Sequence, residues 1–268
     1  MKLLFADMDE TLLTTDKRIS ERNLSAVRAM TESGHGFVMC TGRPLYSCLI
    51  LARQYGLMGK NYYIASYNGG QIIDTGDMRE LVHEGVTLDV VRTLFSEAPA
   101  RGLHVQTYND DCILVEEDSD YIRWYSERIR MPYSVVDDVM TALRAEPIKC
   151  IVAHMTDHEA LIRFQSEVGP LLSDVTDNLF SNPVLLEFGS KKAGKGRALE
   201  SLSSVLGVDI ADTVAVGDEG NDVDMILRAG TGVAMINGVS AAREAADHIT
   251  ESDNDHDAIA EVIERFIL

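Results

Sequence analysis

Two groups of acidic side chains each follow a run of apolar, strand-forming residues. Near the start of the chain, residues 3–6 lead into Asp7 and Asp9, and far downstream residues 213–216 lead through a glycine into Asp218. Side chains two apart in an extended segment point the same way, so the two early acids can converge on one point. In an open α/β sheet, ligands bind at the carboxyl ends of the strands. The two groups therefore predict a single divalent cation site.

Two further polar elements accompany these acids. Thr41-Gly42-Arg43 follows the strand-like residues 36–39, and Lys195 opens a helical stretch. Loops between strands and helices often carry Asp, Asn and Gly simply to cap helices and turn corners, and either acidic group alone is compatible with that structural interpretation. The occurrence of all four elements in one chain favours a functional site.

The four elements, in this order, resemble the short motifs of the haloacid dehalogenase-like (HAD) phosphatase superfamily. Those motifs are Asp-x-Asp-x-Thr, a Thr or Ser after the second strand, a Lys, and Gly-Asp-x-x-Asn-Asp, which match Asp7 to Thr11, Thr41, Lys195 and Gly217 to Asp222. The spacing and the turn at Asn68-Gly69-Gly70 look most like the Cof-type branch, over the whole chain. The resemblance implies an α/β fold: a Rossmann-like parallel-sheet core with an inserted α+β cap of type IIB.

One residue departs from the pattern of that branch. Glu10 stands where the branch usually has glycine. The change leaves Asp7, Asp9 and Thr11 in place, but it puts a bulkier, charged side chain beside the predicted site.

The resemblance implies hydrolysis of a phosphate monoester through an aspartyl-phosphate. Asp7 would be the nucleophile, which divides one difficult step into two easier ones. Asp9 would be the general acid that protonates the leaving oxygen and then takes a proton from water. Two carboxylates that share a site push their pKa values apart, and the one beside the cation stays ionised.

The cation implied is Mg²⁺, a small hard ion that prefers oxygen ligands and keeps much of its hydration. Asp7 and Asp218 would hold it, together with water and a backbone carbonyl near Asp9. Asp222 would orient these ligands or occasionally bind the metal, and Glu219 is close enough in sequence to reach it as well.

Thr41 and Lys195 complete the catalytic set, as a neutral donor and as a compact positive charge. Arg43 would either bind phosphate or pair with an acid, and Gly42 would allow close approach of its backbone N–H. The predicted substrate-binding residues are Met8 (through its N–H), Thr41, Gly42, Arg43, Lys195 and Asn221.

The pattern of elements divides the chain into a core, residues 1–79 and 188–268, and an insertion, residues 80–187. In the core, strand patterns alternate with helix patterns. The strands are expected near 2–6, 36–40, 62–66, 213–216 and 231–235. The helices are expected from Ser20 to Gly34, from Lys195 onward, and near 221–229, 239–246 and 255–266. The insertion predicts strands at 103–108, 112–115, 148–154, 175–176 and 184–188, a helix near 91–95 and a capping box at Thr156 to Glu159. Locally paired strands with intervening helices predict an α+β module, expected to select the leaving group.

Composition restricts the partners. The chain has 268 residues, a size for two domains or one large one, and its hydrophobic fraction of 46% supports a well-buried interior. Its net charge of −19 disfavours nucleic acid and anionic membranes, so any anion site must be created locally. There is no apolar run of membrane-spanning length and no visible signal peptide, and the four cysteines form no C-x-x-C pair. A cytoplasmic location with reduced cysteines is expected.

Three alternatives remain for comparison. Gly189 to Lys195 fits the start of a P-loop, but Gly196 lacks the hydroxyl that would bind Mg²⁺. Transfer of the phosphoryl group to a sugar hydroxyl would make the protein a mutase or phosphotransferase with the same chemistry. A non-catalytic protein that binds a phosphorylated ligand would not need both Asp7 and Asp9. The resemblance implies small phosphorylated metabolites, such as sugar phosphates, as substrates, whereas the sequence does not indicate an oligomeric state.

Overall fold

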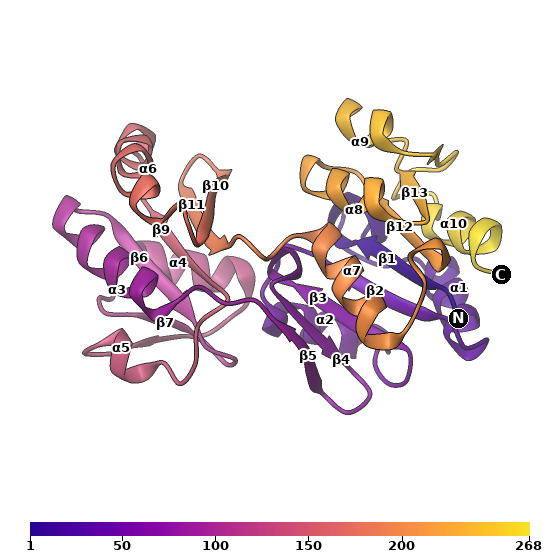
Figure 1. Ribbon diagram of the computed structural model, residues 1–268, viewed down its shortest axis with the longest axis horizontal. Coiled ribbons are helices and arrows are strands. Elements are labelled where there is room, and N and C mark those ends of the chain that lie inside the picture. Colours follow the sequence, from indigo (N-terminus) through magenta and orange to yellow (C-terminus); the bar gives the residue numbers. More distant parts are fainter. The chain divides into compact units, whose positions relative to one another are not determined.

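The computed structural model describes residues 1–268, which form two compact units. The first unit, the core, contains Met1–His83 and Ala193–Leu268, and the second, inserted unit contains Glu84–Lys192. Each unit has its own β-sheet (Figure 1). The insertion expected from the sequence, 80–187, begins and ends a few residues earlier.

The core is built on an eight-stranded sheet in the order β14-β13-β12-β1-β2-β3-β4-β5. The strands are β1 (Leu3–Asp7), β2 (Gly36–Cys40), β3 (Tyr62–Ser66), β4 (Gln71–Asp74), β5 (Arg79–His83), β12 (Thr213–Gly217), β13 (Thr231–Ala234) and β14 (His248–Ile249). Neighbours from β14 to β3 are parallel, whereas β4 and β5 are antiparallel additions at one edge. The prediction of an α/β fold with a parallel-sheet core is confirmed.

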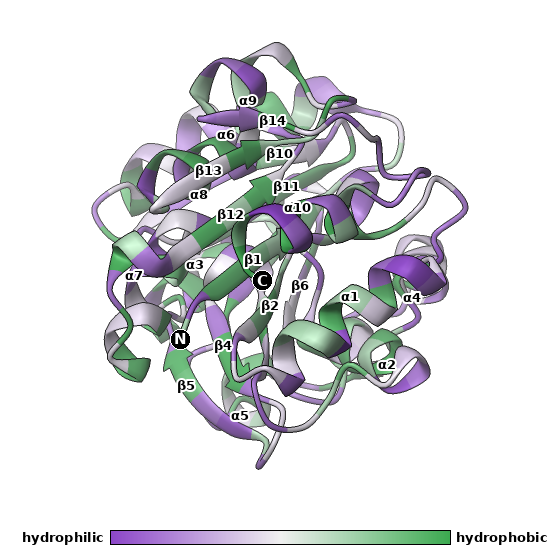
Figure 2. Ribbon diagram, turned by 90° about the vertical axis from the view of Figure 1, so that its right-hand side faces the viewer, coloured by the Kyte–Doolittle hydropathy of each residue, from purple (hydrophilic) through white to green (hydrophobic).

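Helices cover both faces of this sheet, because the central strands are apolar on both sides. The core helices are α1 (Glu21–Glu32), α2 (Leu45–Tyr55), α7 (Lys195–Leu206), α8 (Val223–Arg228), α9 (Ser240–Ala245) and α10 (Ala258–Phe266). In β1, Leu4 packs in a cluster with residues of α1, α2 and α10, while its neighbour Phe5 packs in another with residues of α7 and α8. Figure 2 shows the same contrast: β12 is coloured as hydrophobic, whereas α10 carries both colours. None of the helices has both the length and the apolar character needed to cross a bilayer.

Local signals place the helices that flank the site. Helix α1 begins after Ser20, whose side chain accepts a hydrogen bond from the N–H of Asn23 at 3.1 Å. Helix α2 begins directly after Pro44 and ends at Gly56, where φ is 68°. Helix α7 likewise ends at Gly207, with φ of 66°. Glycine adopts this left-handed conformation at little cost, so it ends both helices.

The inserted unit has a six-stranded sheet in the order β10-β11-β9-β6-β7-β8. Its strands are β6 (His104–Tyr108), β7 (Ile113–Val115), β8 (Tyr133–Val135), β9 (Lys149–Ala153), β10 (Thr176–Asn182) and β11 (Leu185–Ser190). Its helices are α3 (Leu88–Glu97), α4 (Asp120–Ile129), α5 (Val139–Ala142) and α6 (His158–Leu172). Apolar residues of α3 and α6 pack in one cluster with Val105, Val152 and Leu186 from the sheet.

Two local features of the insertion differ from the sequence expectations. The predicted capping box at Thr156 is wrong, because Asp157 is the N-cap of α6 and accepts a hydrogen bond from the N–H of Ala160 at 2.9 Å. Asp caps as well as Thr does, so the helix begins one residue later. Helix α4 is as long as the predicted α3, but it was not predicted, because its buried face consists of two tyrosines and one isoleucine (Tyr121, Ile122 and Tyr125), a weaker apolar pattern than that of α3.

Candidate active site

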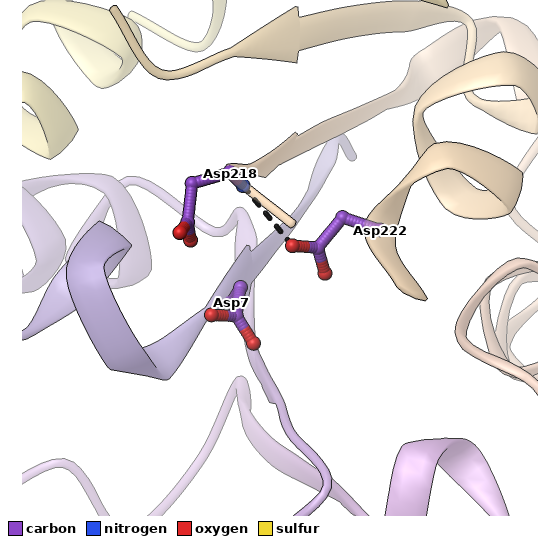
Figure 3. Close-up of side chains that lie close together, drawn as sticks. All are labelled: Asp7, Asp218 and Asp222. Carbon is purple, nitrogen blue, oxygen red and sulfur yellow. Dashed lines mark hydrogen bonds between the residues drawn. The ribbon is translucent and has the colours of Figure 1, made fainter. Parts of the chain in front are cut away.

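Three carboxyl groups meet at the carboxyl ends of β1 and β12. Asp7 ends β1, Asp218 directly follows β12, and Asp222 ends the short turn before α8. Parallel pairing of β1 with β12 brings the two strand ends together. One oxygen of each carboxyl group lies within 4.8 Å of the others, and Figure 3 shows the three groups turned toward one another. We call these three residues the Asp cluster.

Lys195 supplies the positive charge inside this buried cluster. Only 2% of the residue is exposed, and its ammonium group contacts the carboxylates of both Asp7 and Asp222. Its position follows from the sequence, because it is the first residue of α7. The sequence prediction that Lys195 stands beside the strand-end acids therefore agrees with the geometry. When all four groups are ionised, three negative charges face one positive charge.

Hydrogen bonds orient the remaining carboxylate oxygens. Thr11 donates its hydroxyl to Asp218 Oδ1 at 2.7 Å. Asp222 Oδ2 accepts the N–H groups of Asp218 and Glu219, at 3.0 and 2.9 Å. The carboxylate of Glu219 caps the turn by accepting the N–H of Asp222. Glu219, considered above as a metal ligand, thus lies outside the Asp cluster and has a local structural contact.

Burial sets the acidity of the cluster. Burial is the largest influence on Asp7 and raises its pKa to about 7, although the charge of Lys195 opposes the rise. Burial also raises the pKa of Asp218 to about 6, against the hydrogen bond from Thr11. Ionised carboxylates at this position are therefore costly to the fold near neutral pH, and a cation would relieve that cost.

These shifts predict that stability measured without divalent cations falls as pH rises. Because the folded pKa values of Asp7 and Asp218 exceed 3.8, these two groups bind more protons in the folded state than in the unfolded state above pH 3.8, so their contribution to the free energy of unfolding decreases through pH 7. Adding Mg²⁺ should raise the melting temperature more at pH 8 than at pH 5, where protons compete for the same oxygens. Thermal melts at constant ionic strength would measure both effects.

The matched variant for this experiment is Asp218→Asn, which removes one titrating group from the cluster. Its stability should decline less steeply with pH, and it should gain less from Mg²⁺. A melting temperature that does not respond to Mg²⁺ at pH 8 in the unsubstituted protein would contradict the idea that the cluster binds a cation.

Asp9 lies apart from the Asp cluster and is surrounded by cations. Its carboxylate accepts hydrogen bonds from Arg43 Nε at 2.9 Å and Nη2 at 2.6 Å, and Lys17 Nζ lies 3.1 Å from its Oδ1. Burial alone would raise the pKa of Asp9, but the hydrogen bonds and charges of Arg43 and Lys17 hold it below its usual value. The pKa values of Asp7 and Asp9 do differ, but in the opposite order to the one expected. Asp7 was expected to have the lower pKa, whereas Asp9 has it, because cations rather than other carboxylates surround Asp9.

Glu10, the residue that departs from the Cof-type pattern, adopts the left-handed conformation, with φ of 57°. Its side chain accepts hydrogen bonds from Lys17 at 2.7 Å and from Asn254 at 3.2 Å. Its backbone carbonyl accepts one from Asn237 at 2.9 Å. The turn at this position therefore requires a positive φ, which glycine adopts without strain and Glu10 adopts with strain. The side chain of Glu10 is fixed by its contacts with Lys17 and Asn254.

We expect Glu10→Gly to be more stable than Glu10→Ala by about 1 kcal/mol, because a left-handed residue with a Cβ is strained and glycine is not. Both variants lose the contacts with Lys17 and Asn254, so their difference isolates the backbone term. Urea unfolding at equilibrium would measure it. Equal stability of the two variants would mean that the turn relaxes when the side chain is removed.

The loops after β2 and β3 complete the rim of the site. Thr41 is buried just beyond β2, and its hydroxyl accepts the N–H of Arg43 at 3.2 Å. A Cβ on Gly42 would lie 3.2 Å from Asn68 Oδ1, so a side chain there would require Asn68 to shift by a few tenths of an ångström. The same oxygen accepts a hydrogen bond from Asn221 Nδ2 at 3.2 Å. Met8, whose N–H is the remaining predicted contact, is the buried residue that directly follows β1.

Two residues of this region, Asn68 and Lys17, were not predicted as site residues. Asn68 was noted only as part of a turn, yet its Oδ1 accepts a hydrogen bond from Asn221, 153 residues away in sequence, and its side chain lies against Gly42. Lys17 lies in a polar stretch with no motif of its own, and it contacts Asp9 only because the chain folds back. For Asn68, its position before two glycines was the one available signal.

The residues present suit a hard divalent cation. The Asp cluster offers three carboxylate groups with converging oxygens, which is the donor type that Mg²⁺ and similar ions prefer. The cluster is buried, so each carboxylate is already desolvated before any ion binds. A buried group of acids with one ammonium carries excess negative charge, which a divalent cation would balance.

Comparison with known proteins agrees with this geometry. The sequence model of the haloacid dehalogenase-like hydrolases matches residues 4–263, and the chain belongs to that family. A crystal structure of a haloacid dehalogenase-like hydrolase from Bacteroides thetaiotaomicron is 32% identical, covers 98% of both chains and superposes with a TM-score of 0.90.

Two further relatives extend the comparison. The 5-amino-6-(5-phospho-D-ribitylamino)uracil phosphatase YitU of Bacillus subtilis is 27% identical over 98% of this chain and 97% of its own length. A solved HAD subclass IIB sugar phosphatase, 19% identical, shares the fold with a TM-score of 0.77 over 99% of each chain. The resemblance inferred from the motifs is confirmed.

Proposed function

We propose that this protein is a Mg²⁺-dependent phosphohydrolase that removes phosphate from small phosphorylated metabolites through an aspartyl-phosphate. The observation that carries the proposal is the Asp cluster at the ends of β1 and β12, with Lys195 buried against it. The phosphatase relatives support the reaction class. The net charge of −19 argues against nucleic acid or an anionic membrane as a partner.

Asp7 is the nucleophile in this proposal. One of its oxygens forms a bond to phosphorus while the bond from phosphorus to the leaving oxygen breaks, and Asp9 donates a proton to that oxygen. A water molecule then gives a proton to Asp9 and attacks phosphorus, which releases phosphate and restores Asp7. Covalent catalysis at Asp7 fits its position, because Lys195 contacts its carboxylate and favours the ionised form.

The Asp cluster would hold the metal, with Asp7 and Asp218 as ligands and Asp222 orienting them or binding directly. A carbonyl of the loop that carries Asp9 would join them. Bound there, Mg²⁺ supplies positive charge that offsets the charge of the phosphoryl oxygens. Glu219 is the weakest of the predicted ligands, since its carboxylate already caps the turn beside it.

The remaining donors would surround the phosphoryl group. Lys195 and Thr41 are catalytic contacts from α7 and the end of β2. The further contacts proposed are the N–H groups of Met8 and Gly42, and the side chains of Arg43 and Asn221. Fixed donors of this kind stabilise charge that develops in the transition state without having to reorganise.

Proton donation by Asp9 needs its ion pair with Arg43 to open. In the structure two guanidinium nitrogens bind both carboxylate oxygens, which favours the ionised form. We propose that Arg43 turns from Asp9 to the phosphoryl group when substrate binds. The same residue would then serve both roles considered from the sequence, the ion pair and the phosphate contact.

The inserted unit would select the leaving group, as in proteins where a separate module closes on the substrate. The relative from Bacillus subtilis acts on a phosphorylated ribitylamino compound, and a solved relative with this fold is a sugar phosphatase. Both names point to small phosphorylated metabolites. We propose a cytoplasmic location, where such metabolites are present.

A panel of phosphate esters tests this function. The expected result is release of one inorganic phosphate for each ester consumed, with kcat/KM differing among esters. Appearance of an isomeric sugar phosphate instead would identify the mutase alternative. Binding of esters with no turnover of any of them would identify a non-catalytic phospho-ligand protein.

A further inference from the structure

Lys17 belongs to a group of four charged side chains beside the Asp cluster. Its ammonium lies 2.7 Å from Glu10 Oε1 and 3.1 Å from Asp9 Oδ1, and Arg43 binds the same Asp9 carboxylate. We call Asp9, Glu10, Lys17 and Arg43 the rim cluster. Two cations and two carboxylates balance one another when all are ionised. None of the roles assigned above uses Lys17.

The two cations of the rim cluster have donors to spare. A lysine ammonium has three N–H donors, and Lys17 directs two of them at Asp9 and Glu10. A guanidinium has five N–H donors, and Arg43 uses those on Nε and Nη2 for Asp9. The side chain of Lys17 is 47% exposed and that of Arg43 is 31% exposed. A ligand arriving from solvent can therefore reach both.

Glu10 keeps Lys17 in place. The carboxylate of Glu10 is bound on its other oxygen by Asn254, which is 4% exposed and also donates to the carbonyl of Leu13 at 3.1 Å. An ammonium held by such an anchored partner loses little further freedom when it binds a ligand.

We propose that Lys17 forms a subsite for an anionic group, a carboxylate or a second phosphate, on the leaving group of the ester, beside the phosphoryl contact of Arg43. The inference rests on the proposed function, in which Asp9 contacts the leaving oxygen. Parts of the leaving group next to that oxygen then lie beside the partners of Asp9. The protein has a net charge of −19, which repels anionic ligands, whereas these two partly exposed cations attract them locally.

The subsite is tested with two esters that differ in the charge of the leaving group. 3-Phosphoglycerate carries a carboxylate where glycerol 3-phosphate carries a hydroxymethyl group. The quantity measured is the ratio of kcat/KM for the anionic ester to that for the neutral one. In Lys17→Met we expect this ratio to fall by about threefold, which is the scale of one partly exposed charge pair.

Two companion variants make the result specific. Lys17→Arg keeps the charge and should retain most of the preference for the anionic ester. Lys60→Met removes the same charge from an exposed position just before β3, at the strand end opposite the site, and should leave the ratio unchanged. The preference should also weaken as salt concentration rises, because salt screens exposed charges.

Calorimetric binding of the same two esters to Asp7→Asn, with and without Lys17→Met, separates this inference from the proposed function. If both esters bind and Lys17→Met lowers only the affinity for the anionic one, the subsite is supported even where no phosphate is released. If the affinity ratio and the kinetic ratio are both unchanged by Lys17→Met, the subsite is refuted, whereas the phosphatase activity would stand on its own assay.

Discussion

Asp7→Asn should abolish phosphate release, with kcat lowered by about a thousandfold or more, because loss of a covalent nucleophile removes the first chemical step. An amide has nearly the shape of a carboxylate but does not attack phosphorus. The fold should be kept, since Lys195 retains its contact with Asp222 when one partner becomes neutral. Phosphate release measures the first effect, and thermal unfolding measures the second.

Two other variants sharpen this result. Asp174→Asn makes the same chemical change at an exposed turn and should leave kcat unchanged. Asp9→Asn should slow the first turnover of an alkyl phosphate far more than that of 4-nitrophenyl phosphate, whose leaving group needs no proton. Turnover by Asp7→Asn at the rate of the unsubstituted protein would remove Asp7 from the nucleophile role.

Chelation of divalent cations with EDTA should remove turnover to a similar extent, by about a thousandfold or more, and added Mg²⁺ should restore it. The reason is the charge of the site. The three carboxylates of the Asp cluster and the ammonium of Lys195 leave two net negative charges when all are ionised. A dianionic phosphate ester would be repelled by this group, and one Mg²⁺ would bring its charge to zero.

Asp218→Asn is the variant that links this effect to the cluster. It removes one negative donor while leaving Asp7 in place, so more Mg²⁺ should be needed for half-maximal activity. Titration of phosphate release against Mg²⁺ gives that value for both proteins. Undiminished turnover in excess chelator would show that the Asp cluster works without a metal.

Much of the core could be read from local sequence patterns. Ser20 marks the start of α1, Lys195 begins α7, and the apolar runs at β1, β2, β3 and β12 lie where they were expected. These signals work because each depends on neighbouring residues: a hydroxyl that caps a helix, or apolar residues buried on both faces of a parallel strand. In the inserted unit these signals were weaker, since the buried face of α4 consists of two tyrosines and one isoleucine.

Sequence alone implied that Asp7 and Asp218 lie at one edge of the sheet, because the carboxyl ends of parallel strands meet there, whereas the pairing of β1 with β12 makes them neighbours. The partners of Asp9, in contrast, were not implied by the sequence. Arg43 lies 34 residues from Asp9 in sequence, and its pairing depends on how the loop after β2 turns back over the loop after β1. No short-range pattern records such a contact.

The sequence by itself determined that the acids and a threonine lie at the ends of strands on one edge of a parallel sheet, because strand periodicity and chain order suffice for that, and the resemblance of the motifs added the lysine. Only the tertiary structure decided how their charges are paired. Burial raises the pKa of Asp7, and cations lower that of Asp9, because both effects depend on which groups are packed around each carboxylate. Tertiary structure also decides the left-handed backbone of Glu10 and its ion pair with Lys17. Both are supported by contacts of Glu10 with Asn237 and Asn254, which lie more than two hundred residues away in sequence.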